Sequence, residues 1–235
     1  LKQSKFELDS VDIICVTAGP GLIGGLLSGV NFAKGLAFST GKPLIGVNHL
    51  MGHALTPQIT DNLSYPYLTL LASGGHCQYL AVSGANKIER LGTTIDDAPG
   101  EVFDKVAKML NLPIFSGSEV EKYAKKGNKS RFSFPLPLVN KNDCDLSFSG
   151  LKSSVRRQVD YLVEKQSGLY VNDQRDICAS FQEAMKLIFE NKTKKALELF
   201  SKVSSKKELS FSLAGGVAAN ETIRCSLKEL CKELN

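Results

Sequence analysis

The strongest constraint on the fold is the pattern of apolar runs in the first fifty residues. Residues 11–18 (VDIICVTA) and 42–49 (KPLIGVNH) are short apolar runs typical of buried strands. Between them, residues 21–41 form an apolar, small-residue segment that ends at Gly41, a common helix stop. Two strands joined by a helix make a β-α-β unit, so the sequence predicts an α/β protein.

This unit places a histidine at the end of its second strand, the edge where α/β sheets bind ligands. His49 stands there, and His53 follows four residues later. In a helix both imidazoles would share one face and could bind one divalent ion. Packed or capping histidines are the alternative. The zinc-protease pattern needs a Glu as general base where this chain has Leu50, so a metal here would hold or polarise a ligand rather than support proteolysis.

The rest of the chain predicts a second α/β region. Residues 67–94 predict an antiparallel hairpin around the turn Ser73-Gly74-Gly75, residues 96–112 predict a helix, and residues 113–149 indicate a basic, loop-rich segment. Further elements are predicted at 150–166 (helix), 174–204 (helix), 209–216 (strand) and 218–234 (helix). We expect two regions, 1–64 and 65–235. An α/β sheet normally has further strands, so we also expect truncation at both ends.

Composition narrows the class of protein. With 235 residues, 43% of them hydrophobic, the chain can bury a real core. It has neither a run of roughly 18 apolar residues nor an apolar core near its start, so we expect no membrane partner. Six scattered cysteines without a C-x-x-C pair argue against a zinc ribbon and suit a reducing compartment.

The net charge of +5 permits an anionic partner. Basic residues gather at 122–131 and 152–157, which are candidates for nucleic-acid contact, with ordinary solvated faces as the alternative.

Common nucleotide and hydrolase motifs are absent from the sequence. The pattern Gly19-x-Gly21-x-x-Gly24 resembles a dinucleotide fingerprint, but the next strand ends in Asn48 and His49 rather than an acid, which favours close helix packing instead. The sequence contains neither a P-loop nor a nucleophile elbow. Their absence argues against a common type of NTPase and against an α/β-hydrolase.

Three other features could form one nucleotide site. The turn Ser73-Gly74-Gly75 could wrap phosphate oxygens with its amides. Asp104 and Glu121 could accept hydrogen bonds from ribose hydroxyls. Gly215-Gly216 and Asn220 lie where a strand turns into a helix, and such a turn favours an anion. The alternatives are a tight turn, a helix-dipole partner and a helix cap. Together the features suggest a nucleotide held between two α/β lobes.

The motifs TAGPGLIGG, NHLMGHAL, LLASGGHCQ, IDDAPGEVFDKVAK, LSFSGLKS and AGGVAAN, in this order, resemble the TsaD family across nearly the whole chain. The resemblance implies an α/β fold of the actin-like, Hsp70-like (ASKHA) type with two lobes. It also implies a tRNA N6-adenosine threonylcarbamoyltransferase, an acyltransferase that moves threonylcarbamoyl from threonylcarbamoyl-AMP to the adenosine 3′ of the anticodon in tRNAs reading codons that begin with A.

The resemblance also implies binding roles for individual residues. It identifies no certain catalytic residue. It implies one divalent ion per subunit, iron(II) or alternatively zinc, with the protein ligands His49 and His53. The implied substrate and nucleotide contacts are Leu71, Ala72, Ser73, Gly74, Gly75, Asp104, Gly117, Glu121 and Asn220. The chain departs from the family pattern in lacking the first-strand motif and the third metal ligand, a late Asp, and in having Ser116-Gly117-Ser118 where Gly-Gly-Pro is usual.

The implied partners are tRNA, threonylcarbamoyl-AMP and, in a bacterium, TsaB-like and TsaE-like proteins, with a TsaC-like synthase that makes the donor. The implied location is the cytoplasm, or alternatively the mitochondrial matrix. A noncatalytic, nucleotide-binding subunit similar to TsaB is the second hypothesis, and the histidine pair discriminates, because such a subunit has no need of metal ligands. A metallopeptidase is the third, and Leu50 argues against it.

Overall fold

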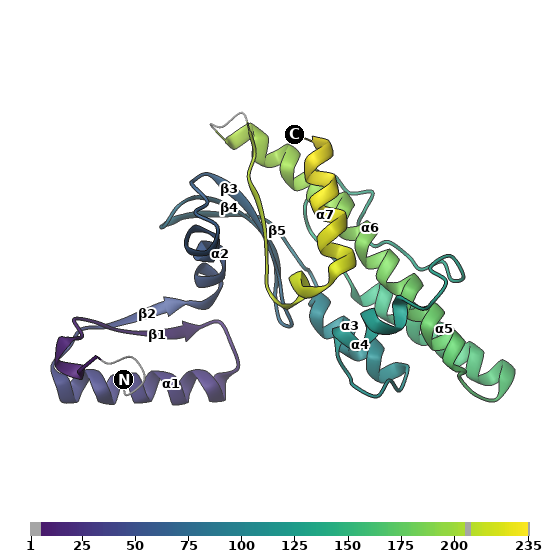
Figure 1. The fold of residues 1–235 in the computed structure, drawn as a ribbon, viewed down its shortest axis with the longest axis horizontal. Helices are drawn as coiled ribbons and strands as arrows, with labels where there is room; N and C mark the ends of the chain where they lie inside the picture. Colours follow the sequence, from purple (N-terminus) through teal and green to yellow (C-terminus); the bar gives the residue numbers. More distant parts are fainter. Residues whose placement is uncertain (1–5, 205–207, 235) are drawn as a thin grey trace. The chain divides into compact units, whose positions relative to one another are not determined.

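The computed structural model describes residues 6–204 and 208–234 (Figure 1). It contains two compact units, Leu1–Thr56 and Pro57–Asn235. The boundary between them lies inside the helix α2 (His49–Thr60). The division after residue 64 that the sequence suggests stays a prediction.

The first unit is the β-α-β unit that the sequence predicts. After a short 3-10 helix, η1 (Leu8–Ser10), come β1 (Ile14–Gly19), α1 (Ile23–Thr40) and β2 (Leu44–Asn48), and the two strands pair in parallel. Helix α1 ends at Gly41, whose φ of 67° lies in the left-handed region that glycine tolerates. Ile14, Ala33 and Ala37 form the small core between helix and strands. The predicted β-α-β unit is therefore confirmed.

The second unit is built on a four-stranded sheet. Its strands are β3 (Tyr67–Ala72), β4 (Cys77–Gly84), β5 (Lys87–Thr93) and β6 (Phe211–Ala214), in the order β5-β4-β3-β6. Strand β3 is antiparallel to β4 and parallel to β6, and all of its residues are buried. The predicted hairpin is confirmed, and it forms the centre of this sheet.

The helices of the second unit follow the sequence pattern with one correction. They are α3 (Pro99–Met109), α4 (Gly117–Ala124), α5 (Ser149–Gln166), α6 (Val171–Val203) and α7 (Glu221–Leu234), with the 3-10 helix η2 (Gly216–Ala219) before α7. Helix α4 lies in the segment expected to be loop-rich. Its N-cap Ser116 accepts a hydrogen bond from Glu119 N, and Val120 and Ala124 are buried. The Ser-x-x-Glu pattern at residues 116–119 is the capping signal for this helix.

None of the helices within the described ranges combines the length and the apolar character that a membrane crossing requires.

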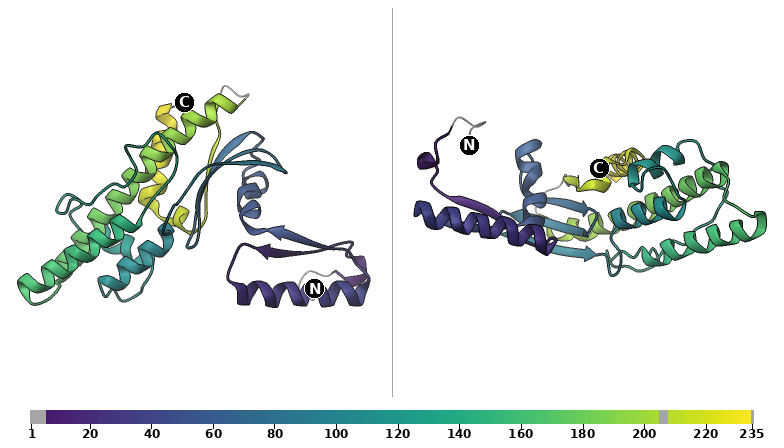
Figure 2. Two further views of the ribbon diagram at one scale, coloured as in Figure 1. Left: turned by 180° about the vertical axis from the view of Figure 1, so that it is seen from behind. Right: turned by 90° about the horizontal axis from the view of Figure 1, so that it is seen from below.

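Helix α6 contacts the sheet and several other helices of the second unit. Figure 2 shows it beside α5 in both views. The Tyr79 hydroxyl of β4 lies 2.9 Å from the Thr193 hydroxyl of α6, and the Phe103 ring of α3 meets Phe181 edge-on at a centroid distance of 5.0 Å. Both contacts are buried, so α6 packs against the sheet and against α3.

A buried lysine on α6 holds the loop before α5. Lys192 is fully buried, and its Nζ donates to Asp143 O at 2.8 Å and to Asp143 Oδ1 at 3.1 Å. A buried ammonium group is tolerated only when it is paired in this way. Lys195 donates to Val139 O and Lys141 O of the same loop. These bonds fix the chain that leads into α5.

We expect Gly215→Ala to destabilise the protein. Gly215 has a φ of 98°, and an added Cβ would lie 2.4 Å from Ala72 O, so alanine would combine backbone strain with a clash. The free energy of unfolding, measured by urea titration, should fall by roughly 2–3 kcal/mol. Gly216→Ala is the control, since its Cβ would meet nothing within 4 Å and should change stability by less than about 1 kcal/mol. Equal stability of the two variants would contradict this account.

Candidate functional site

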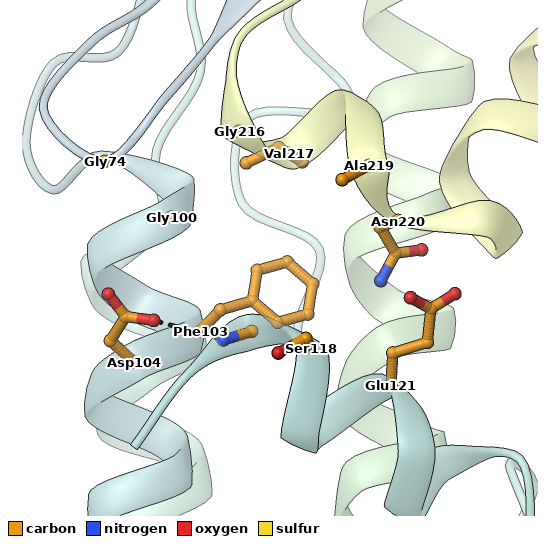
Figure 3. A pocket seen from close by; sticks show the side chains of 11 residues that line it. Gly74, Gly100, Phe103, Asp104, Ser118, Glu121, Gly216, Val217, Ala219 and Asn220 are labelled. Atoms are coloured by element: carbon orange, nitrogen blue, oxygen red, sulfur yellow. Dashed lines mark hydrogen bonds between the residues drawn. The ribbon is translucent and has the colours of Figure 1, made fainter. Parts of the chain in front are cut away.

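A pocket of about 280 Å³ opens in the second unit, at the edge where β3 and β6 end (Figure 3). This volume is near the lower end of small-ligand sites, about 300–1,000 Å³. Its walls come from the β3–β4 turn, α3, the first turns of α4, and the η2–α7 junction. The lining residues are Gly74, Gly100, Phe103, Asp104, Gly117, Ser118, Glu121, Gly216, Val217, Ala219 and Asn220.

The pocket brings together site residues that are far apart in the sequence. Gly74, Asp104, Gly117, Glu121 and Asn220 all line it. The remaining predicted substrate residues lie close in the chain but outside the lining: Leu71 and Ala72 are fully buried in β3, and Ser73 and Gly75 flank Gly74 in the turn.

The tip of the hairpin is shaped for close backbone approach. Ser73 closes the turn, donating from its N to His76 O at 2.8 Å and accepting at its Oγ from His76 N at 3.1 Å. The amides of Gly74 and Gly75 have no hydrogen-bond partner within residues 6–204 and 208–234. An added Cβ at Gly100 would lie 2.9 Å from Gly74 Cα, so glycine lets the first turn of α3 reach the tip. Free amides beside a helix N-terminus favour an anion.

Asp104 links α3 to the start of α4. Its Oδ1 accepts a hydrogen bond from Gly117 N at 3.1 Å, drawn as the dashed line in Figure 3. An added Cβ at Gly117 would lie 3.3 Å from Phe103 Cβ, so the two segments are in close contact. The structure gives Asp104 Oδ2 no partner in the described ranges, which leaves this oxygen able to accept from a ribose hydroxyl.

Glu121 and Asn220 hold the first turn of α7. Glu121 Oε1 accepts from Glu221 N at 2.8 Å, and Asn220 Oδ1 accepts from Ile223 N at 3.0 Å. Asn220 is 8% exposed, and its Nδ2 donates to Gln182 Oε1 at 2.8 Å. Asn220 is therefore the cap of α7, the alternative role predicted for it. Capping also fixes both side chains at the pocket wall, so the two roles are compatible.

Asp96 connects the loop before α3 with the start of α5. It accepts hydrogen bonds from Phe148 N at 2.8 Å and from the hydroxyl groups of Ser147 and Ser149 at 2.5 and 2.7 Å. Burial raises the pKa of Asp96, but these hydrogen bonds together outweigh burial and lower the pKa below its usual value. The carboxylate form thus holds the two segments together.

The histidine pair lies in the first unit. Asn48 Oδ1 accepts from Leu50 N at 2.9 Å and starts α2 directly after β2, so His49 does stand at the carboxyl end of a strand. The His49 and His53 Nε2 atoms are 3.3 Å apart. Burial, and then the charge of His49, lowers the pKa of His53, which favours the neutral, ligating form.

The spacing of the imidazoles fits one ion. Two nitrogens bound at about 2.0–2.1 Å to a tetrahedral ion lie about 3.3–3.4 Å apart. The same distance suits a direct hydrogen bond between the two rings. Among the residues that the structure describes, no group of three or more His, Cys, Asp or Glu side chains could hold a metal.

Sequence reasoning missed Gly100, Phe103, Ser118, Val217 and Ala219 as lining residues. The dipeptide Pro99-Gly100 at the start of α3 is the signal for Gly100, because proline favours a helix start and glycine disfavours a helix unless another segment approaches closely. The other four become neighbours only through tertiary packing.

The fold belongs to a known class. The chain is similar to the solved structure of full-length HypF in its phosphate- and nucleotide-bound form, with a TM-score of 0.62 and 15% identity over 95% of this chain and 36% of that one. The chain is thus an α/β protein of the actin-like (ASKHA) type.

Sequence comparison identifies the family. The chain belongs to the TsaD family, whose profile, described as tRNA N6-adenosine threonylcarbamoyltransferase, matches residues 1–235. A relative of that name from Roseobacter denitrificans is 52% identical over 99% of this chain and 64% of its own length. Another of that name from Jannaschia sp. is 56% identical over 95% of this chain and 60% of its own length. The chain thus spans less than two thirds of these relatives.

We expect Asp96→Asn to change how stability depends on pH. The folded-state pKa of Asp96 lies below the unfolded value of about 3.8, so its stabilisation is present above that pH and is lost as pH falls through the folded pKa. Urea midpoints should favour the native protein over Asp96→Asn at pH 7 and converge below about pH 3.8. A gap that stays constant across this range would contradict the assigned role of the carboxylate.

Proposed function

We propose that this chain carries the donor-binding part of a tRNA N6-adenosine threonylcarbamoyltransferase. In this reaction N6 of the adenosine 3′ of the anticodon, in tRNAs reading codons that begin with A, attacks the carbamoyl carbonyl of threonylcarbamoyl-AMP. A carbon–nitrogen bond forms, the bond to the phosphate oxygen breaks, AMP leaves, and N6 loses a proton. The observation that supports this most is the pocket that gathers Gly74, Asp104, Gly117, Glu121 and Asn220 in a member of the TsaD family.

The pocket supplies positioning and charge rather than a nucleophile. AMP is a good leaving group, so acyl transfer needs an aligned donor and stabilisation of developing charge. The free amides of Gly74 and Gly75 suit a phosphate, and the open carboxylate oxygens of Asp104 and Glu121 suit ribose hydroxyls. Phe103 offers an aromatic ring to the pocket, as Figure 3 shows.

We extend the proposal to one divalent ion, iron(II) or alternatively zinc, held by His49 and His53. The 3.3 Å between their Nε2 atoms and the lowered pKa of His53 support a ligand pair. The ion would act as a Lewis acid that polarises a carbonyl or phosphoryl oxygen of the donor.

The proposed reaction also implies specific substrates and protein partners. Unmodified tRNA and threonylcarbamoyl-AMP are the substrates, and a TsaC-like synthase makes the donor. TsaB-like and TsaE-like proteins are the proposed protein partners, since the relatives that match this chain come from bacteria. The reaction must take place where tRNA is present, which is the cytoplasm, or the mitochondrial matrix for an organellar protein.

The second candidate is a noncatalytic nucleotide-binding subunit similar to TsaB. The 3.3 Å between the Nε2 atoms of His49 and His53 also suits a direct hydrogen bond between the two rings, and this favours a subunit that has no need of metal ligands. The metallopeptidase alternative has less support, since Leu50 occupies the place of the general base.

A transfer assay tests the metal ligands. The intact gene product, with donor synthase, ATP, bicarbonate and the proposed protein partners, should move labelled threonine into unmodified tRNA. His49→Ala with His53→Ala should lower bound metal, measured by elemental analysis, and reduce transfer by at least about a hundredfold. Full transfer by the double variant would remove the histidines from the mechanism. Absence of transfer by the native protein with every partner set would favour the noncatalytic subunit.

A binding assay tests the nucleotide pocket. Asp104→Asn keeps an oxygen for Gly117 N but removes the negative charge that a ribose hydroxyl would contact. We expect the Kd for AMP, measured by calorimetry, to rise about tenfold, the loss of roughly 1.4 kcal/mol expected for a charge-assisted hydrogen bond. Asp160→Asn is the control, because Asp160 is exposed on α5 and, among the described residues, pairs only with Arg156. An unchanged Kd in Asp104→Asn would remove this carboxylate from the site.

A further inference from the structure

The basic segment 122–131 is mostly neutralised by acidic side chains. Its ion pairs are Lys122 with Glu119, Lys125 with Glu221, Lys129 with Glu183, and Arg131 with both Asp173 and Asp176. Lys126 is exposed and has no acidic partner within the described ranges. The charge available to an external anion is therefore concentrated at one position of this segment.

Lys126 lies at a small pocket with two other cations. The pocket has a volume of about 170 Å³ and is lined by Pro113, Glu119, Lys122, Tyr123, Lys126 and Arg175. The Arg175 side chain donates to Asn172 Oδ1 at 3.4 Å and forms no ion pair within the described ranges. Glu119 is 5% exposed, and its carboxylate already accepts from Lys122 Nζ. Three cations face one carboxylate here, so the pocket carries excess positive charge.

The cations are brought together by a close backbone contact. An added Cβ at Gly127 would lie 2.0 Å from Arg175 O, so glycine allows the turn after α4 to lie against the backbone of α6. Asn128 N then donates to Asp176 Oδ1 at 2.7 Å, and Gln174 Nε2 donates to Leu110 O at 2.8 Å. The two segments that carry the other pocket residues, the one with Pro113 and the one with α4 and its following turn, are thus fixed to α6, which reduces the entropy cost of binding a ligand there.

Helix α4 separates this pocket from the nucleotide pocket. Ser118 and Glu121, three residues apart, line the nucleotide pocket. Glu119, Lys122 and Tyr123 have the spacing of a different helix face and line the basic pocket. Two anionic groups could therefore bind at the same time on either side of α4.

We propose that the basic pocket binds a backbone phosphate of an RNA strand. The cations Lys126 and Arg175 would contact the phosphate, beside the paired Lys122, and the half-buried Tyr123 ring and Pro113 give an apolar wall for the adjoining nucleotide. Exposed Ile114 and Phe115, at 60% and 53%, extend this apolar surface along the chain. The identity of the RNA as tRNA rests on the proposed function.

The test measures tRNA binding by the intact gene product, with anisotropy of labelled, unmodified tRNA over a range of salt concentrations. The variant combines Lys126→Ala with Arg175→Ala. The control combines Lys87→Ala with Arg90→Ala, which removes the same two charge types from exposed positions of β5. Thermal melting checks that both variants fold.

We expect the pocket variant to raise the Kd about tenfold and to lower the slope of log Kd against log salt by about 0.7, the value for one single-stranded phosphate contact. The control should match the native protein. Equal losses in variant and control, or no loss in either, would overturn the pocket. So would binding of inorganic phosphate or AMP in this pocket as tightly as tRNA, since that indicates a site for free anions.

Transfer of threonine, measured in parallel, separates this proposal from the proposed function. Native transfer with unchanged tRNA binding in the pocket variant refutes the pocket and leaves the enzyme intact. Weakened tRNA binding without any native transfer supports the pocket and refutes the enzyme.

Discussion

The pocket in the second unit depends on the close approach of three backbone segments at the end of the central hairpin. An added Cβ at Gly215 would lie 2.4 Å from Ala72 O, and one at Gly100 would lie 2.9 Å from Ser73 O. At each contact a side chain would force the strand end and its neighbour apart. The turn therefore presents its amides between the end of β6 and the start of α3, and the other lining residues take their places relative to that turn.

Local patterns predicted the elements that carry the site, and tertiary contacts decided the rest. The β-α-β unit and the hairpin at Ser73-Gly74-Gly75 were readable because strand and helix periods differ and glycine marks the turns. Helix α4 was missed because prolines and lysines around it indicate a loop, whereas its capping by Ser116 and the burial of Val120 stabilise a short helix. Phe103 lines the pocket beside Gly117, which packs against it. Sequence periodicity does not predict this contact between two separate helices.

Two residues that the sequence predicts as ligand contacts have a structural role. Glu121 and Asn220 each accept a hydrogen bond from an amide in the first turn of α7. This arrangement holds their polar groups at the pocket wall before any ligand arrives, so less side-chain freedom is lost on binding. Because both oxygens of a carboxylate accept, Glu121 can cap the helix and still contact a hydroxyl group. A helix cap and a ligand contact are therefore not competing interpretations of this residue.

Ion pairs determine which cations of segment 122–131 are available to an anion. The sequence shows a run of cations at 122–131, yet most of them cross to acids on other helices and so contribute to holding α4 and its following turn against α6 and α7. A charge that is already paired gains less from a phosphate, because the existing pair must be broken or shared. The position of an anionic partner therefore follows from the pairing of cations rather than from their number. Pairing is a tertiary property, which is why the run alone could not distinguish a binding surface from a solvated one.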